Sequence, residues 1–441
     1  MKKHTTRLIL FLAIVSAIRL FIIQNLELSP DEAYYWDWSR HLQLSFYDHP
    51  PMVAVFIYLS TWLGGHSEFF VRLTAVLSVA GLSVIAYILG RDLYDSERAG
   101  YYSVLWLNVL PLVSLGAIVI TPDTPQALFF VLTIYLLYRA IFKNQTRYWY
   151  FSGVSLGLAL LSKYTAALLV PCLFIFLFFS YRYKPLLRKK EPYIFLALSG
   201  LVFSPVILWN SMHQWVSLKF QFRHGFDGKS INPLSNSLEF LGTQLGLATP
   251  FVFVGIGVVM LYCYRSWRER KDDRFIYLPA LSVPIFVFFL VVSFKSKVEG
   301  NWPAMVYLLA TIAMAGFYIT QGGREKTSRV KWFYWLKQSA IITTVLVAVV
   351  VHVHTQFRIV PIPPKKDFLK RLHGWELLGQ HAGKFLYSET GQANAFVFAD
   401  RHQIVSELAF YIPGQPQTYQ RHGLKRYPYL GNLRHLIGQD G

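Results

Sequence analysis

Residues 69–90 read FFVRLTAVLSVAGLSVIAYILG, with a single charge at Arg72. A hydrocarbon layer about 30 Å thick requires about 20 consecutive apolar residues for one helical crossing. The stretch therefore predicts a membrane-spanning helix. The whole chain has the same character, because 54% of its residues are hydrophobic, 15% are charged and the mean hydropathy is +0.35. A soluble domain carries about 25% charged residues, so the composition predicts a polytopic membrane protein.

Apolar blocks separated by short polar stretches predict eleven spans. They are residues 8–26, 69–90, 99–119, 125–142, 149–162, 165–180, 193–209, 239–264, 275–294, 302–319 and 338–354. The stretch 149–181 is short for two crossings, but both of its flanks are basic, so we predict two short helices with Lys163 at the turn between them. A cleaved signal peptide is an alternative interpretation of the first block.

The carboxyl-terminal tail differs from the rest of the chain because it is more charged and contains no further apolar block. Its sequence predicts a buried strand at Ala395–Ala399 and a short helix over 401–411. We therefore predict an all-α polytopic membrane domain over 1–354, with about eleven transmembrane helices, and a small α/β module over 355–441.

The basic residues indicate how the spans are oriented. The net charge of +19 could indicate nucleic-acid binding, but such proteins gather their basic residues on one face. Here these residues lie in short loops, and we predict no nucleic-acid partner. With the amino terminus inside, the cytoplasmic pieces 1–7, 91–98, 143–148, 181–192, 265–274 and 321–337 hold 22 Lys and Arg, whereas the outer loops hold seven. This bias predicts that the loop 27–68 and the carboxyl terminus face outward.

The first outer loop, 27–68, is rich in acidic and aromatic residues. It contains Ser29-Pro30-Asp31-Glu32-Ala33-Tyr34-Tyr35-Trp36 and Phe46-Tyr47-Asp48-His49-Pro50-Pro51. A structural interpretation is a helix start at Ser29 or Asp31 with aromatic residues at the membrane interface. Further candidate residues, however, lie at other predicted outer turns. They are Asp123, Lys163, Lys295, Lys297, Asn301 and Trp302.

Carboxylates, cations and aromatic rings at one membrane depth suit the transfer of a sugar carried on a lipid phosphate. A base must take the proton of the acceptor hydroxyl, and positive charge must stabilise the departing phosphate. Aromatic rings can cover the apolar faces of a sugar. A lipid carrier also removes the need for a nucleotide site, and the sequence has no phosphate-binding loop of the Gly-Lys kind.

The chain resembles the integral-membrane glycosyltransferases of the GT-C type. Within them, it is similar to the bacterial branch that shares the protein mannosyltransferase-like domain with the lipid A aminoarabinose and galacturonic acid transferases. The matching segments begin at Asp31, Tyr47, Thr121, Ser162, Asn301 and Ser406. This resemblance implies an inverting transfer from an undecaprenyl-phosphate (polyprenyl-phosphate) sugar to a glycolipid or glycan acceptor, such as lipid A or lipopolysaccharide core. It also implies a bacterial inner-membrane protein whose active site and carboxyl terminus face the periplasm.

The resemblance assigns roles to particular residues. The catalytic carboxylates are expected to be Asp31, Glu32, Asp48 and Asp123, with Asp31 the candidate base. The donor phosphate is expected to be bound by His49, Lys163, Lys295, Lys297 and Arg223. The sugar or the acceptor is expected to contact Tyr34, Tyr35, Tyr47, Asn301 and Trp302. Many relatives have a Glu-Lys pair where this chain has Asp48-His49, and a histidine carries only partial charge at neutral pH.

Several alternatives remain open from the sequence. A divalent cation, Mg²⁺ or Mn²⁺, could be held by Asp31, Asp48 and Asp123, although no ligand spacing requires it. Residues 210–238 are interpreted as an amphipathic helix on the membrane surface, with a lid near the phosphate, including Arg223 or His224, as the alternative. The competing functions are a protein O-mannosyltransferase-like enzyme and a lipid or sugar transporter (flippase). We find no internal repeat of the kind that transporters carry.

Overall fold

A computed structural model describes residues 2–226, 232–321, 328–357, 359, 361, 371–388, 395–421 and 426–430. The helices in the first part of the chain are α1 (Lys2–Ile23), α2 (Pro30–Arg40), α3 (Met52–Gly64), α4 (Glu68–Tyr94), α5 (Glu97–Val109), α6 (Pro111–Gly116), α7 (Asp123–Phe142), α8 (Arg147–Leu160), α9 (Leu169–Phe179) and α10 (Glu191–Met212). The later elements are α11 (Val216–Phe226), α12 (Pro233–Ala248), α13 (Pro250–Arg270), α14 (Arg274–Ser293), α15 (Ala304–Gln321), α16 (Ser328–Phe357), α17 (Trp375–Ser388), β1 (Val397–Ala399), α18 (His402–Tyr411) and β2 (Thr418–Gln420).

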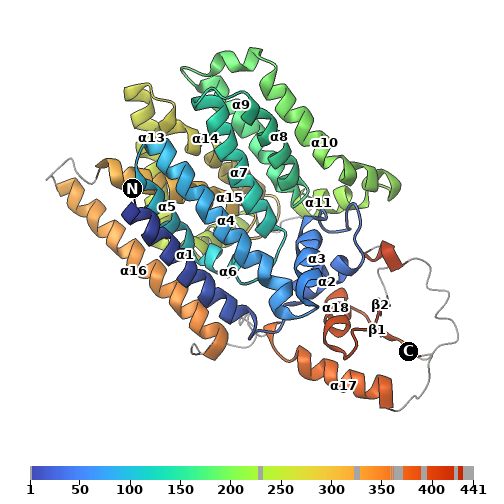
Figure 1. The fold of residues 1–441 in the computed structure, drawn as a ribbon. Coiled ribbons are helices and arrows are strands. Elements are labelled where there is room, and N and C mark those ends of the chain that lie inside the picture. The colour runs from blue at the N-terminus through green and yellow to red at the C-terminus, as the bar shows by residue number, and fades with distance from the viewer. Residues whose placement is uncertain are drawn as a thin grey trace.

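Long helices form a bundle, and α2, α3 and the tail gather at one end of it (Figure 1). Within the described residues, six helices are long and apolar enough to cross a membrane: α1, α4, α7, α10, α13 and α14. Each of the other predicted spans also overlaps a helix. The prediction of an all-α, multi-pass membrane protein is confirmed.

The predicted division of residues 149–181 into two short helices agrees with the structure. Helix α8 ends at Leu160, and a short 3-10 helix, Tyr164–Leu168, leads directly into α9. Lys163 lies in the turn between them, at the same end of the bundle as α2. The chain reverses here because the backbone of residues 161–163 leaves the helix and Lys163 is extended (φ −158°).

Two predicted features differ from the structure. The predicted outer loop 27–68 contains two helices, α2 and the apolar α3. The predicted span 239–264 is divided between α12 and α13, because Thr249 has a positive φ of 66° and Pro250 starts the next helix. Proline suits the first turn of a helix, where its missing N–H would be unpaired in any case. Sequence periodicity alone does not reveal this break, since both halves are apolar.

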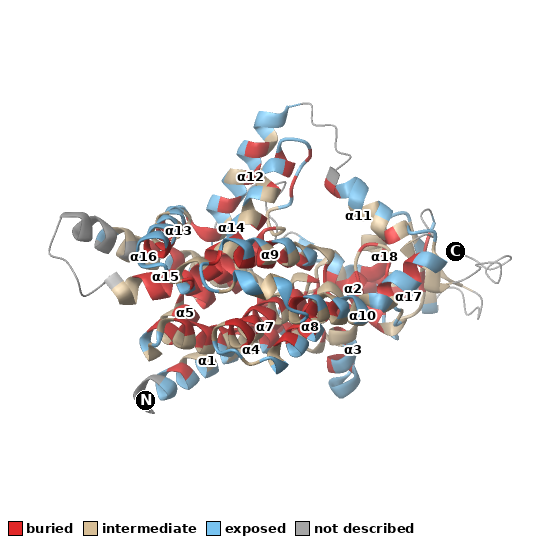
Figure 2. Cartoon of the chain, turned by 90° about the horizontal axis from the view of Figure 1, so that it is seen from above, coloured by how far each residue is buried: buried red, intermediate tan, exposed pale blue. Residues whose placement is uncertain are grey.

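The tail contains a strand and a helix where they were predicted, but the strand β1 is not buried as expected, because Phe398 is exposed and Val397 and Ala399 are only half-buried. β1 pairs in parallel with β2, in the register Val397–Thr418, and α18 covers the predicted segment 401–411. Helix α18 packs against α2 through one apolar cluster, in which the rings of Trp36 and Phe410 meet edge to face at 4.9 Å. Figure 2 shows the buried residues continuing from the bundle into α2 and α18.

Polar contacts also fasten the tail to the segment around α2. The Tyr411 hydroxyl accepts a bond from the Leu28 backbone N–H (2.6 Å), and the Tyr429 hydroxyl donates to Asp37 (2.7 Å). The backbone N–H of Trp375 donates to Glu27 (2.6 Å). The tail therefore shares one core with the first loop, and its side chains can contribute to a site formed there.

The predicted cytoplasmic loops meet at the opposite end of the bundle. Asp273, which precedes α14, accepts bonds from the backbone of Tyr181 and Arg182 and from the Trp267 indole. Arg274 reaches Asp95 at 2.9 Å. The described parts of these loops thus lie at the end of the bundle opposite to α2.

Candidate active site

Asp31 lies at the second position of α2, where local sequence determines its place. Ser29 caps this helix: its hydroxyl accepts from the Glu32 N–H, and the Glu32 carboxylate accepts from the Ser29 N–H. This reciprocal capping, with Pro30 as the first helical residue, holds the start of α2 in a defined conformation. Within the described part of the chain, no donor bonds to the Asp31 carboxylate. Although Asp31 is exposed to cavities, the surrounding protein desolvates it and raises its pKa, while Arg371 opposes the rise.

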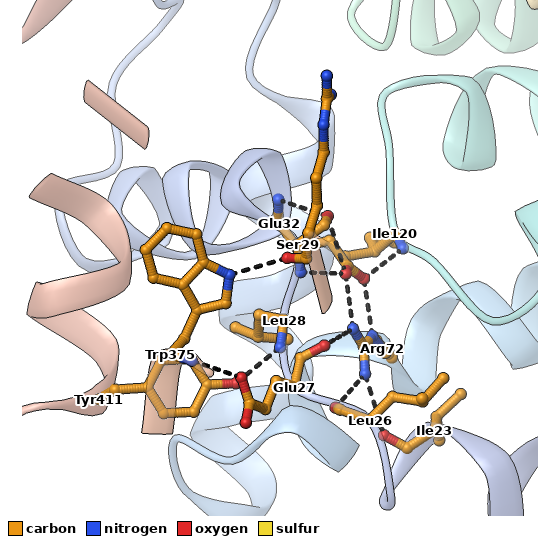
Figure 3. Close-up of polar contacts among 11 residues, drawn as sticks. Ile23, Leu26, Glu27, Leu28, Ser29, Glu32, Arg72, Ile120, Trp375 and Tyr411 are labelled. Atoms are coloured by element: carbon orange, nitrogen blue, oxygen red, sulfur yellow. Dashed lines mark hydrogen bonds and ion pairs between the residues drawn. The ribbon is translucent and has the colours of Figure 1, made fainter. Parts of the chain in front are cut away.

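Glu32, the neighbouring carboxylate, is fully buried against Arg72 of α4 (Figure 3). Arg72 Nε and Nη2 lie 2.8 and 2.7 Å from its two oxygens, and the Ile120 backbone N–H donates to it at 3.0 Å. The remaining Arg72 nitrogen donates to the Leu26 carbonyl at the end of α1. This network joins α1, α2, α4 and the segment before α7, and so fixes the position of Asp31.

A cavity of about 1010 Å³ opens beside Asp31. We call it the main cavity. It is lined by the first loop, the start of α7, the turn after α8, the helix α11, the segment before α15 and the tail. Its polar and aromatic lining residues include Asp31, Tyr34, Tyr35, Asp48, His49, Asp123, Lys163, Tyr164, Gln221, His224, Lys297, Glu299, Asn301, Trp302, Arg371, His402, Gln403 and Arg426.

One wall of the main cavity carries a Lys–Asp pair. Lys163 Nζ lies 2.8 and 2.9 Å from the two oxygens of Asp123, and Asn301 donates to the same carboxylate at 2.8 Å. The Lys163 side chain is 8% exposed and that of Asp123 is 19% exposed. These contacts join three turns that are distant in the sequence, and the carboxylate of Asp123 neutralises the charge of Lys163.

A second pair lies opposite, where Arg426 of the tail contacts the Asp48 carboxylate. Tyr34 donates its hydroxyl to the same oxygen of Asp48 at 3.0 Å. The guanidinium carbon of Arg426 lies 4.9 Å from the ring centroid of Tyr47 and 5.5 Å from that of Phe220. This arrangement places a tail residue, flanked by two aromatic rings, inside the main cavity.

His49 is held neutral in this environment. Burial lowers its pKa to about 3, and the nearby charge of Lys163 acts in the same direction. Its Nδ1 atom is buried and has no hydrogen-bond partner in the described residues. A neutral imidazole can donate or accept a hydrogen bond at its ring nitrogens, but it cannot supply the positive charge expected of a phosphate-binding residue.

A second cavity of about 800 Å³ adjoins the first. Asp31, Arg371 and Gln403 line both cavities. The rest of the second cavity is largely apolar, with Arg401 as a further cation, and its apolar lining consists of Leu26, Leu115, Ile118, Val119, Leu372, Trp375 and Ile404. The unbonded carboxylate of Asp31 is therefore accessible from two separate spaces.

Comparison with known proteins identifies similar sequences and similar structures. Residues 48–209 match the family described as dolichyl-phosphate-mannose-protein mannosyltransferase. The lipid A galacturonosyltransferase RgtD of Rhizobium johnstonii is 27% identical over 287 residues, which cover 64% of this chain and 59% of that protein. The structure of ArnT from Cupriavidus metallidurans, bound to undecaprenyl phosphate, matches with a TM-score of 0.68 and 16% identity, over 97% of this chain and 88% of that chain. This chain is related to the GT-C-type membrane glycosyltransferases.

A further solved structure, the Archaeoglobus fulgidus oligosaccharyltransferase tethered with an acceptor peptide, matches with a TM-score of 0.56 and 13% identity. It covers 95% of this chain, but only 64% of its own length is matched. At these identities the solved structures show the fold of the present chain and not its function. The roles of its side chains have to be argued from its own geometry.

The GT-C fold brings most of the expected site residues together. Asp31, Asp48, Asp123, His49, Lys163, Lys297, Tyr34, Tyr35, Asn301 and Trp302 line the main cavity. Tyr47 lies behind it, against Arg426. Lys297 stands at the mouth, where it is 62% exposed and pairs with Glu239 at 2.8 Å.

Three expected residues lie elsewhere. Glu32, expected to be catalytic, is enclosed in the pair with Arg72 and lines neither cavity, so we assign it a structural role. Lys295 and Arg223 are exposed and do not line the main cavity, although they were expected to bind phosphate. In each case a neighbour along the chain, such as Lys297 or His224, faces the cavity instead.

Helix α11 differs from the preferred interpretation as a surface helix. Leu218, Phe220, Gln221, Phe222 and His224 line the main cavity, so this helix forms one of its walls. The His224 ring lies 5.6 Å from that of Trp302. Of the two residues named in the alternative interpretation of a lid near the phosphate, His224 lines the cavity and Arg223 does not.

The sequence did not reveal the contribution of the tail to the site. Arg371, His402, Gln403 and Arg426 all line the main cavity. Arg371 and Arg426 lie among many other basic residues of the tail, and no spacing marks them. The segment starting at Ser406, one of those on which the resemblance rests, is the signal that could have pointed to this region.

The possible metal site at Asp31, Asp48 and Asp123 does not form a single ligand set. Among the described residues, no three His, Cys, Asp or Glu side chains converge in a way that could hold a metal ion. Asp48 is paired with Arg426 and Asp123 with Lys163. We therefore derive no step through a metal ion.

Proposed function

We propose that this protein is an inverting glycosyltransferase that moves a sugar from a polyprenyl phosphate, such as undecaprenyl phosphate, to an envelope glycolipid such as lipid A or lipopolysaccharide core. The observation that carries the proposal is the unbonded carboxylate of Asp31 between two cavities. A transferase that joins two lipid-borne substrates needs a base that both can reach. Related proteins named as a lipid A galacturonosyltransferase and as ArnT bound to undecaprenyl phosphate support the same substrate classes.

The main cavity suits the donor. It combines cations with the rings of Tyr35 and Trp302, and a sugar phosphate needs both positive charge and a surface for its apolar faces. The second cavity suits the acceptor, because apolar side chains can accommodate acyl chains while Arg371 and Arg401 attract anionic groups on a glycolipid.

Asp31 would act as the base. Its pKa is raised by desolvation, which makes it a stronger proton acceptor than a fully solvated aspartate. The acceptor hydroxyl transfers its proton to Asp31 while its oxygen forms a bond to the anomeric carbon. The bond between that carbon and the phosphate oxygen breaks, and the electron pair leaves with the phosphate. Attack from the face opposite the phosphate inverts the anomeric configuration.

We place the site on the periplasmic face of the inner membrane, with the carboxyl terminus on the same side. The support is the distribution of Lys and Arg between loops, together with the gathering of the predicted outer loops at the main cavity. We retain the division into a transmembrane domain, 1–354, and a carboxyl-terminal module, 355–441, and propose that both contribute to the site.

Mass spectrometry of envelope lipids tests the proposal. Cells that lack the gene, express the wild-type protein or express Asp31→Asn are compared. A hexose, pentose or uronic-acid mass on a lipid, present only with the wild type, is the expected result. Asp95→Asn is a matched control, because Asp95 is exposed at the opposite end of the bundle, and it should retain the added mass.

The alternatives give different results in the same cells. An added mass on proteins instead of lipids would indicate a protein O-mannosyltransferase-like activity. An added mass that persists in Asp31→Asn cells would remove Asp31 from the role of base. If neither lipids nor proteins change when the gene is lost, a flippase becomes the better explanation.

A further inference from the structure

Four basic side chains line the main cavity within the described residues: Lys163, Lys297, Arg371 and Arg426. Three histidines also line the cavity. Burial lowers the pKa of His49 to about 3 and that of His402 to about 4, and the ring of His224 stacks on that of Phe220. The four Lys and Arg side chains are therefore the permanent cations available to a donor phosphate in this cavity. Their surroundings distinguish them.

Lys163 and Lys297 are engaged in other contacts. Lys163 uses its ammonium group on both oxygens of Asp123, a carboxylate that Asn301 also contacts. Moving Lys163 to a phosphate would leave a largely buried carboxylate without its cation, which is costly. Lys297 is exposed at the mouth and pairs with Glu239, so solvent screens its charge.

Arg371 is placed to act on Asp31. It lines the wall shared by the two cavities, and its charge lowers the pKa that desolvation raises. Arg426 acts on the same pKa in the same direction, but more weakly than Arg371 does. A phosphate bound to Arg371 would place further negative charge near Asp31 and would weaken the effect of Arg371.

Arg426 has both the free donors and the accessibility that phosphate binding requires. A guanidinium has five N–H donors. In the described residues one of its nitrogens, Nη1, contacts the carboxylate of Asp48, and the Tyr34 hydroxyl is a further side-chain partner. The Arg426 side chain is 24% exposed, against 8% for Lys163. The nearby rings of Tyr47 and Phe220 hold the guanidinium in place, and its planar fork matches the oxygens of a phosphate.

The contacts of Asp48 show how this cation could be released. Its Oδ2 atom accepts from both Arg426 and the Tyr34 hydroxyl, and its backbone carbonyl accepts from Gln221 of α11. If Arg426 turned toward a phosphate, Asp48 would keep the bond from Tyr34. Asp48 would lose its cation but keep this hydrogen bond, as Asp123 would keep that of Asn301 if Lys163 moved. The two cations differ in that Lys163 contacts both oxygens of Asp123, whereas Arg426 contacts one oxygen of Asp48.

We propose that Arg426, contributed by the carboxyl-terminal tail, binds the phosphate of the polyprenyl-phosphate donor, and that Asp48 holds its guanidinium in the cavity until the phosphate arrives. This inference rests on the proposed function. Arg426 stays protonated throughout. When the sugar leaves, Arg426 stabilises the negative charge that accumulates on the departing phosphate.

The test measures binding of undecaprenyl phosphate, without any sugar, to the purified full-length protein in lipid nanodiscs. Arg426→Gln should raise the Kd about tenfold or more, because a charged hydrogen-bond donor is lost. Arg426→Lys should recover part of the affinity, since it keeps the charge but not the planar fork. Arg421→Gln, an exposed arginine of the same tail, is the matched control and should leave the Kd unchanged.

Asp48→Asn separates phosphate binding from a purely structural contact. If Arg426 binds the phosphate, removing the competing carboxylate should leave the Kd unchanged or lower it. If Arg426 only anchors the tail through Asp48, Asp48→Asn and Arg426→Gln should raise the Kd equally, and the inference is then wrong. An unchanged Kd in Arg426→Gln would also overturn it. If Arg426 does not bind the phosphate, the added lipid mass is still expected in wild-type cells and its absence is still expected in Asp31→Asn cells. The two proposals therefore fail separately.

Discussion

Arg72 and Glu32 form a fully buried bidentate pair, with nitrogen–oxygen distances of 2.8 and 2.7 Å. Arg72 belongs to the long helix α4, and Glu32 follows the candidate base directly in sequence. A charge inside a membrane span is expensive unless it faces protein and is paired. Here the pair fixes the segment that carries Asp31, and both oxygens of Glu32 are bonded to Arg72.

Glu32→Gln should destabilise the protein strongly. It leaves the Arg72 guanidinium buried without its counter-ion, and breaking a buried pair costs about 3–5 kcal/mol. The melting temperature of the detergent-solubilised protein measures the effect. Glu239→Gln, which breaks the exposed pair with Lys297, is the control and should cost about 1 kcal/mol or less. Equal melting temperatures for the two variants would show that the buried pair stabilises the protein no more than the exposed pair does.

Lys163→Gln should reduce stability and turnover together, because the carboxylate of Asp123 and the amide of Asn301 both depend on this lysine for their arrangement. We expect it to raise the Kd for undecaprenyl phosphate less than Arg426→Gln does. The double variant Lys163→Gln/Asp123→Asn should recover part of the stability, since no unpaired charge remains. A larger increase in Kd for Lys163→Gln than for Arg426→Gln would return the phosphate role to Lys163.

The pH dependence of transfer should follow Asp31. A base must be deprotonated, so kcat/KM falls as the pH drops through its raised pKa. Arg371 opposes that rise, and Arg371→Gln should therefore move the acidic limb of the profile to higher pH. Arg421→Gln removes an arginine outside the cavities and should not move it. A limb that stays in place or moves to lower pH in Arg371→Gln would show that this arginine does not act on Asp31.

His49 should make the folded protein sensitive to acid. Its pKa is about 3 in the folded protein, against 6.5 for an ordinary histidine, so below pH 6.5 the unfolded chain binds a proton that the folded protein does not. Stability is therefore lost as the pH falls, by about 2 kcal/mol at pH 5. His49→Gln removes this contribution, and its melting temperature should decline less between pH 7 and pH 5 than that of the wild type. An identical decline would show that His49 takes up a proton in the folded state.

His49→Gln should also retain most of the affinity for undecaprenyl phosphate, because the imidazole it replaces is neutral. We expect a change in Kd of about threefold or less, the scale of one ordinary hydrogen bond. A loss as large as that of Arg426→Gln would mean that His49 is protonated when the phosphate is bound.

The spans could be predicted because the membrane imposes a local rule. About 20 apolar residues are required wherever the chain crosses, and each backbone polar group must be satisfied within the helix. Runs such as residues 69–90 therefore identify helices without any knowledge of their neighbours. The start of α2 could also be predicted from local sequence, since Ser29, Pro30 and Glu32 lie within four positions of one another.

The pairing of charges depended on tertiary structure. Asp48 and Arg426 are separated by 378 residues. Lys163 and Asn301 come from distant segments and both donate hydrogen bonds to Asp123. The sequence alone determined the helical membrane architecture and the acidic first loop, because both follow from patterns within one segment. Only packing decided that Glu32 supports the fold, that His49 is neutral and that the tail supplies a cation, because burial and counter-ions arise where distant segments meet.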